Sequence, residues 1–142
     1  MTRIDIDIFP IDFTLDRRQK VRGKVKLYSE CAEDPNLVQI TAEIDGDLYT
    51  EKAGNFFEAL QRLRLRLEKN TIQICCNGAA ETVYPSFMQL DMGDGQLAYK
   101  QTLGKPARTA DIVGIFDCEE GLNFTTVKAQ KDFHAKWLQS KA

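Results

Sequence analysis

Two alternating segments near the start of the chain constrain the fold more than any other feature. Residues 4–13 alternate between apolar and mostly acidic side chains, and residues 21–27 alternate between apolar and basic ones. A period of two is typical of a β-strand with one buried face. Placing Phe13 opposite Val21 puts Asp12 opposite Arg22, so that apolar faces apolar and acid faces base. The two segments are therefore predicted to form an antiparallel hairpin.

The apolar phase of the first segment shifts by one residue at Pro10. A proline cannot donate to the ladder, and a bulge of one residue produces such a shift. Skipping one residue there pairs Ile8 with Val25 and Asp7 with Lys26, which again matches apolar with apolar and acid with base. The sequence thus predicts a β-bulge at Pro10.

The rest of the chain alternates strand and helix patterns. Further strands are predicted over residues 37–44, 47–52, 72–76, 97–103 and 111–116, and helices over 56–69 and from about 125 onward. Asn55 is the expected cap of the first helix, and its outer face is expected to carry the ion pairs Glu58–Arg62 and Arg64–Glu68. The prediction is one α+β domain over residues 1–142. It has a largely antiparallel sheet of about six to seven strands, with two helices packed on one face.

Composition excludes several classes of protein. The 142 residues carry a net charge of −2, and no stretch approaches the length of apolar sequence that crosses a bilayer. Aspartates interrupt residues 1–13, which is unlike a secretory signal, so a cytoplasmic protein without a membrane segment is expected. With one histidine, His134, and no Cys-x-x-Cys pair, neither a metal site nor a cofactor is predicted. The four cysteines are expected to be reduced, small apolar residues.

Residues 77–96 lack a regular pattern and are the main candidate for a functional segment. Loops of this length are uncommon in compact domains and are often functional. Two interpretations stay open: a loop that folds back on the core, with a short helix inside it, and a binding loop. For the second, the candidate binding residues are Tyr84, Ser86, Phe87, Met88, Asp91, Met92 and, on the next strand, Tyr99.

Catalysis and nucleic-acid binding are alternatives with less support. A hydrolase would need Ser86 or a cysteine beside His134, but no Gly-x-Ser-x-Gly elbow surrounds Ser86. Basic residues crowd one arm of the hairpin, Arg17 to Lys26, and could hold a nucleic-acid backbone. Their expected cross-strand acidic partners, and the absence of an alternating aromatic platform, favour a solvated face instead.

The second half of the chain resembles a small bacterial protein family with no established activity. The similar motifs are Cys76-Asn77-Gly78-Ala79, Val83-Tyr84-Pro85-Ser86, Asp91-Met92-Gly93, Ala98-Tyr99-Lys100 and Ile115-Phe116-Asp117, together with Gln130, Phe133 and Trp137. The resemblance covers roughly residues 55–140 and implies no catalytic residue. By analogy, small acidic bacterial domains of this type include immunity proteins that neutralise a toxin.

These observations favour a non-enzymatic module that binds another macromolecule, with a protein as the expected partner. A small-ligand-binding protein or hydrolase that uses residues 77–96 and His134 is the alternative. Nucleic-acid binding through the basic arm is weaker. The sequence leaves the oligomeric state open.

Overall fold

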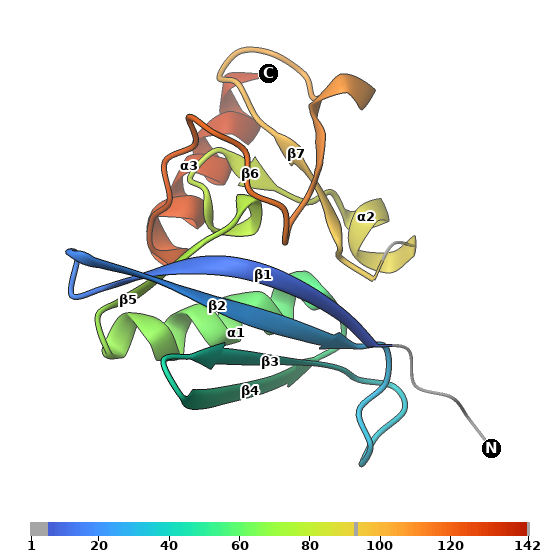
Figure 1. The fold of residues 1–142 in the computed structure, drawn as a ribbon. Coiled ribbons are helices and arrows are strands. Elements are labelled where there is room, and N and C mark those ends of the chain that lie inside the picture. Colours follow the sequence, from blue (N-terminus) through green and yellow to red (C-terminus); the bar gives the residue numbers. More distant parts are fainter. Residues whose placement is uncertain (1–5, 93, 142) are drawn as a thin grey trace.

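The computed structural model describes residues 6–92 and 94–141, apart from the side chain of Met92. Ile4 and Asp5, the first alternating residues of the predicted hairpin, lie outside the described residues. The first sheet has five strands. Figure 1 shows α1 packed on this sheet and a second layer of strands and helices above it. The chain runs through β1 (Ile6–Leu15), β2 (Gln19–Tyr28), β3 (Val38–Ile44), β4 (Asp47–Ala53), α1 (Phe56–Lys69), β5 (Ile72–Cys75), β6 (Val83–Tyr84), α2 (Phe87–Met92), β7 (Leu97–Lys100), β8 (Ile112–Gly114) and α3 (Val127–Ser140).

The α+β class and the antiparallel pairing are confirmed, but the strands form two sheets where the sequence suggested one. The first sheet has the order β4-β3-β2-β1-β5 and the second β6-β7-β8. The chain leaves the first sheet after Cys75. The backbone amides of Asn77 and Gly78 then donate to Asp117 O and Ile115 O, which follow β8, rather than to β1. The two predicted helices consequently pack differently, α1 on the first sheet and α3 against β6 and α1.

The register of the first hairpin is confirmed at its turn and wrong beyond Pro10. Phe13 lies opposite Val21 and Asp12 opposite Arg22, as expected. The ladder then continues without a bulge, with Pro10 opposite Lys24. Proline is tolerated at this point of β1 because only the stretch from Asp12 to Leu15 pairs with β5 on the other side.

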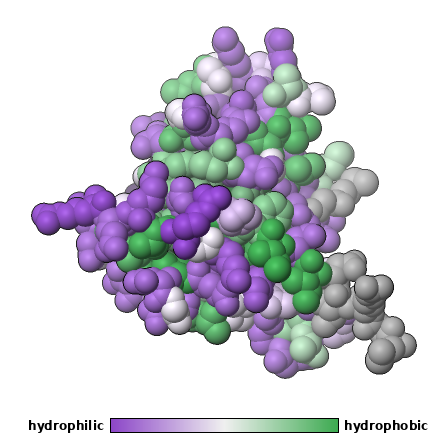
Figure 2. All heavy atoms as spheres, in the orientation of Figure 1, coloured by the Kyte–Doolittle hydropathy of each residue, from purple (hydrophilic) through white to green (hydrophobic). Residues whose placement is uncertain are grey.

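The unbroken ladder determines which apolar side chains of β1 face the core. It turns Phe9 toward the core, where its ring lies 5.6 Å from that of Phe116. Ile8 is left 57% exposed, and Ile6 is exposed on the same face. Figure 2 shows hydrophobic surface at this place, beside the grey residues where β1 begins. The register therefore packs one aromatic ring against a second one and leaves two isoleucines in solvent.

Gly23 on β2 lets the first three strands approach one another. A Cβ built there would lie 2.3 Å from Glu43 O and 2.9 Å from the Phe13 ring. Gly23→Ala is therefore expected to lower the free energy of unfolding by roughly 1–3 kcal/mol, as overpacking does. Urea denaturation measures it, with Gly54→Ala as the matched control, because its new methyl group would meet only Glu58 Oε2 at 3.9 Å. Equal stability of the two variants would contradict this account of the β1–β2–β3 contact.

Helix α1 spans the predicted residues, and Asn55 caps it by accepting a hydrogen bond from Glu58 N. The apolar stripe is buried, but the expected outer-face pair Arg64–Glu68 is wrong. Arg64 is only 2% exposed, and Glu68 accepts a hydrogen bond from Val127 N at the start of α3. Arg62 was expected to pair with Glu58, but its guanidinium donates to Lys52 O instead.

Arg64 instead joins α1 to the second layer. Its guanidinium donates to Gly78 O at 3.2 Å, to Gln130 Oε1 at 2.5 Å and to Thr125 O at 2.8 Å. Burial lowers the pKa of Arg64 from its ordinary value, and the neighbouring Cys76 and Glu68 oppose that shift. An arginine in these surroundings keeps its charge, so a buried cation holds the two layers together.

Candidate functional site

Residues 77–92 and 94–96 hold regular elements, although their sequence lacks a regular pattern. The segment contains a helical turn at Asn77–Ala79, then β6, then α2. Its first part packs into the core: Asn77 is buried, its amide donates to Gly114 O, and its side-chain oxygen accepts from Glu119 N. Its second part differs, because Phe87 and Met88 on α2 are 89% and 69% exposed. The start of the segment therefore folds back on the core. Only its end, around α2, is left as a candidate binding surface.

A cleft of about 590 Å³ opens beside α2. Segments far apart in the sequence surround it, namely β6, α2, β7, the loop at Pro106 and the last turns of α3. Figure 1 shows β7 running between α2 and α3. The lining residues are Tyr84, Pro85, Ser86, Phe87, Leu90, Tyr99, Gln101, Pro106, Ala107, His134, Trp137, Leu138 and Lys141. A cleft of this size with a few polar groups in an apolar lining is typical of a binding site.

The structure brings together only some of the residues that the sequence proposed. Tyr84, Ser86, Phe87 and Tyr99 all line the cleft, and so does His134, which the hydrolase alternative required. Met88 and Asp91 do not line it and face solvent on α2. The side chain of Met92 lies outside the described residues.

Sequence reasoning did not assign Gln101, Leu138 or Lys141 to the site. On α3 a signal existed, because residues 134, 137, 138 and 141 follow the i, i+3, i+4, i+7 spacing of one helical face. That spacing predicts a shared face but not which strand the face meets. Gln101 follows β7 directly and carries no pattern that would single it out.

A row of nearly parallel rings lies along the cleft. The Tyr84 and His134 rings are stacked with centroids 4.0 Å apart and planes 11° apart. Trp137 follows at 6.0 Å from His134 with planes 22° apart, and the Lys141 ammonium lies 3.8 Å from the centre of the Trp137 ring. Tyr84 is held from behind by Phe57 on α1, edge to face at 5.1 Å. The row is therefore anchored to the core and ends in a cation.

Gln101 fixes the orientation of the imidazole in this row. Its side-chain amide is buried next to His134 Nδ1. The amide nitrogen Nε2 lies 2.9 Å from Nδ1, and the amide oxygen Oε1 lies 3.2 Å from it. The shorter contact favours donation from the amide to Nδ1, which places the imidazole proton on Nε2. Burial, and to a smaller extent the charge of Lys141, lowers the pKa of His134. His134 is thus neutral near pH 7.

The candidate nucleophiles are engaged elsewhere. Ser86 caps α2 reciprocally with Gln89: its hydroxyl accepts from Gln89 N at 3.2 Å, and its amide donates to Gln89 Oε1 at 2.8 Å. Within the described part of the chain, no hydrogen bond joins Ser86 to His134. Cys76 is fully buried, and burial raises its pKa to about 12. Ser86 therefore caps α2, and the Cys76 thiol is shielded from solvent.

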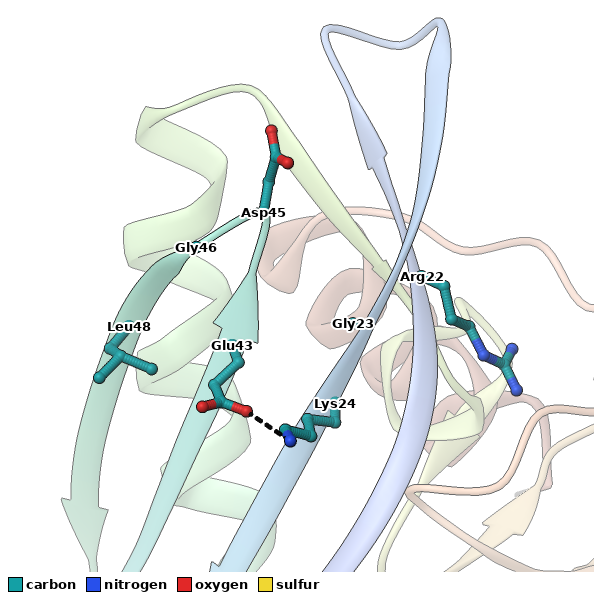
Figure 3. A pocket seen from close by; sticks show the side chains of 7 residues that line it. All are labelled: Arg22, Gly23, Lys24, Glu43, Asp45, Gly46 and Leu48. Atoms are coloured by element: carbon teal, nitrogen blue, oxygen red, sulfur yellow. Dashed lines mark ion pairs between the residues drawn. The ribbon is translucent and has the colours of Figure 1, made fainter.

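A second hollow, of about 430 Å³, lies on the first sheet and is open and charged. Figure 3 shows the Lys24 ammonium on β2 directed at the Glu43 carboxylate on β3, 3.1 Å away, with Arg22 pointing to the other side. Arg22 pairs with Asp12 at 3.0 Å, as the hairpin register predicted. Because these basic charges are paired across strands, the hollow offers a weak site for an anion.

Comparison with known proteins adds no functional assignment. The chain matched none of the protein-family models searched, and none of the curated proteins matched it in sequence. Among residues 6–92 and 94–141, no cluster of three His, Cys, Asp or Glu could hold a metal ion. No helix in the same ranges is both long and apolar enough to cross a membrane.

Proposed function

We propose that this protein is a non-enzymatic binding module that recognises another protein through α2 and the adjoining rim of the cleft. The observation that carries the proposal is the pair Phe87 and Met88, an aromatic and a thioether side chain that stand next to each other and are largely exposed. Isolated exposed apolar residues are ordinary, but aromatic residues and methionine are enriched in the buried centres of protein interfaces.

The way in which α2 is held supports this role. The Ser86–Gln89 cap fixes the first turn of α2, and Leu90 N donates to Ser86 O. Behind them, Tyr84 packs on Phe57 in the core. A rigidly presented apolar pair loses little conformational entropy when a partner covers it, which favours affinity.

Affinity capture with a matched control tests the proposal. The tagged wild-type protein, the double variant Phe87→Ser/Met88→Ser and the control Leu48→Ser are incubated with lysate of the native cells. Leu48 is 63% exposed but lies on β4 of the other sheet. A partner retained by wild type and Leu48→Ser, and reduced about tenfold or more by the double variant, is expected if the pair lies at an interface centre. Equal capture by all three folded proteins would remove α2 from the interface.

A toxin-neutralising role is a narrower form of the same proposal, suggested by analogy with small acidic bacterial domains that act as immunity proteins. It requires that the captured partner stop the growth of cells that lack this protein. Co-expression of the wild-type protein would then restore growth, and co-expression of the Phe87/Met88 double variant would not.

Binding of a small ligand is the second candidate function, and the cleft favours it. Its volume falls within the range of pockets that hold small molecules, and its lining is mostly apolar with a few polar groups. The chemistry of the lining residues allows the class of ligand to be narrowed.

A further inference from the structure

We infer that the cleft binds a flat aromatic group that carries a carboxylate, with the ring against the apolar lining and the carboxylate at Lys141. The inference deepens the second candidate function and rests on it, since it assumes that the cleft is a binding site. Its test uses small probes and does not require the protein partner proposed for α2.

The shape and polarity of the lining favour a flat apolar group. The stacked rings of Tyr84, His134 and Trp137 line the cleft together with Phe87 and Tyr99. The other apolar lining residues are aliphatic, namely Pro85, Leu90, Pro106, Ala107 and Leu138. Aromatic groups interact well with the edges and faces of other rings, whereas a hydrated polar group would lose its water there without replacement.

The charge of the lining favours an anion. Among the described lining residues, Lys141 is the only one with a full charge near pH 7, and none is acidic. Its ammonium is held above the Trp137 ring, and no ion pair of Lys141 occurs within the described residues. Two neutral donors line the same cleft, the Nε2–H of His134 and the Ser86 hydroxyl, and both can donate to a carboxylate oxygen.

One cation and two neutral donors are too few to hold a phosphate. A phosphate carries more charge and more acceptor oxygens than a carboxylate, and it is held by several cations or by a row of backbone amides. The cleft offers one lysine in a mostly apolar lining. A single negative charge on an apolar body is the better match.

The chain contains two natural reporters of the cleft, because Trp137 is its only tryptophan and His134 its only histidine. Their ring NMR signals can therefore be assigned without ambiguity. Purified protein is titrated with 2-naphthoate and with its uncharged analogue 2-naphthamide, and the Trp137 indole and His134 ring signals are followed. We expect saturable shifts with the acid and about two- to fivefold weaker binding of the amide, the size of one exposed ion pair.

The variant Lys141→Met assigns the preference to Lys141, because methionine keeps an apolar stem at an exposed position. In this variant the acid and the amide should bind equally. N-acetylphenylalanine and its amide form the second pair of probes. If the acid of this pair binds and its amide binds more weakly, the carboxylate can come from a C-terminal aromatic residue of a protein. If only naphthoate binds, the ligand is a free aromatic acid.

Three results would overturn the inference. They are equal binding of naphthoate and naphthamide to the wild-type protein, a preference for the acid that persists in Lys141→Met, and no saturable shift with any probe at millimolar concentration. Capture of a partner by α2 is measured separately, so failure of these titrations is distinguishable from failure of the protein-binding proposal.

Discussion

Arg64→Met is expected to lower the free energy of unfolding by about 2–6 kcal/mol, because it takes the donor away from two buried hydrogen-bond acceptors. Replacing a whole buried ion pair with apolar residues can be neutral, but two partners of Arg64 are backbone carbonyls, of Gly78 and Thr125, which no substitution removes. Gln130 Oε1 would lose its donor as well. Gly78 O keeps the Gln130 side-chain nitrogen as a donor, whereas Thr125 O and Gln130 Oε1 lose Arg64. Each buried acceptor left without a partner costs about 1–3 kcal/mol.

Gln130 extends the hydrogen-bond network of Arg64 to further backbone carbonyls. Its side-chain nitrogen lies 2.9, 2.9 and 2.7 Å from the carbonyl oxygens of Gly78, Ala80 and Val83. Because an amide nitrogen carries two hydrogens, at least one of these bonds is shared. Arg64 and Gln130 thus act as one unit that ties α1 and α3 to the segment between β5 and β6.

Urea denaturation of the wild-type protein and four variants tests this unit. Lys69→Met, at an exposed position on the same helix, is the control and should change stability by no more than about 0.5 kcal/mol. Gln130→Leu should destabilise strongly on its own, and Arg64→Met/Gln130→Leu should cost less than the two single effects added together, since both remove the same contact. A loss of 1 kcal/mol or less in Arg64→Met would show that the carbonyls find other partners.

Arg64 also shows where the sequence argument for the fold failed. It lies four residues after Leu60 and three before Leu67, so its spacing places it on the buried stripe of α1. Its charge led to the outer-face prediction, because arginines are seldom fully buried without a partner. The partners come from residues 78, 125 and 130, and no local pattern indicates that these meet α1. The helix itself was predictable because its cap and period are local.

For the candidate site too, the sequence indicated the local segment but not the distant residues that meet it. Tyr84 and Tyr99 are cross-strand neighbours in the second sheet, but β6 has two residues and β7 four, too few for alternation to reveal a pairing. The aromatic content of residues 77–96 did indicate the right segment. The imidazole of His134 reaches that segment through the packing of α3 on β6, a contact between distant parts of the chain.

Cys76 is expected to react with iodoacetamide at least about 100-fold more slowly than the exposed Cys118 in the native protein. The attacking species is the thiolate, and a pKa of about 12 leaves Cys76 almost wholly protonated at pH 8. The cause is burial, which outweighs the opposing effect of the Arg64 charge. Labelling for increasing times, followed by mass spectrometry of the peptides, measures both rates in one sample. Comparable rates at the two sites would contradict the buried position of Cys76.

The same measurement separates two effects of Arg64 on its neighbour. Loss of the cation in Arg64→Met would raise the thiol pKa further, so in a rigid protein Cys76 would react even more slowly than in wild type. Loss of the network has the opposite effect, because opening around Asn77–Ala79 exposes the thiol to reagent. We expect opening to dominate, with faster labelling of Cys76 in Arg64→Met and a smaller change at the buried Cys31, which lies far from the network in sequence. Slower labelling of Cys76 would mean that the segment stays closed without Arg64, and that the network fixes the position of α3 more than it stabilises the core beneath it.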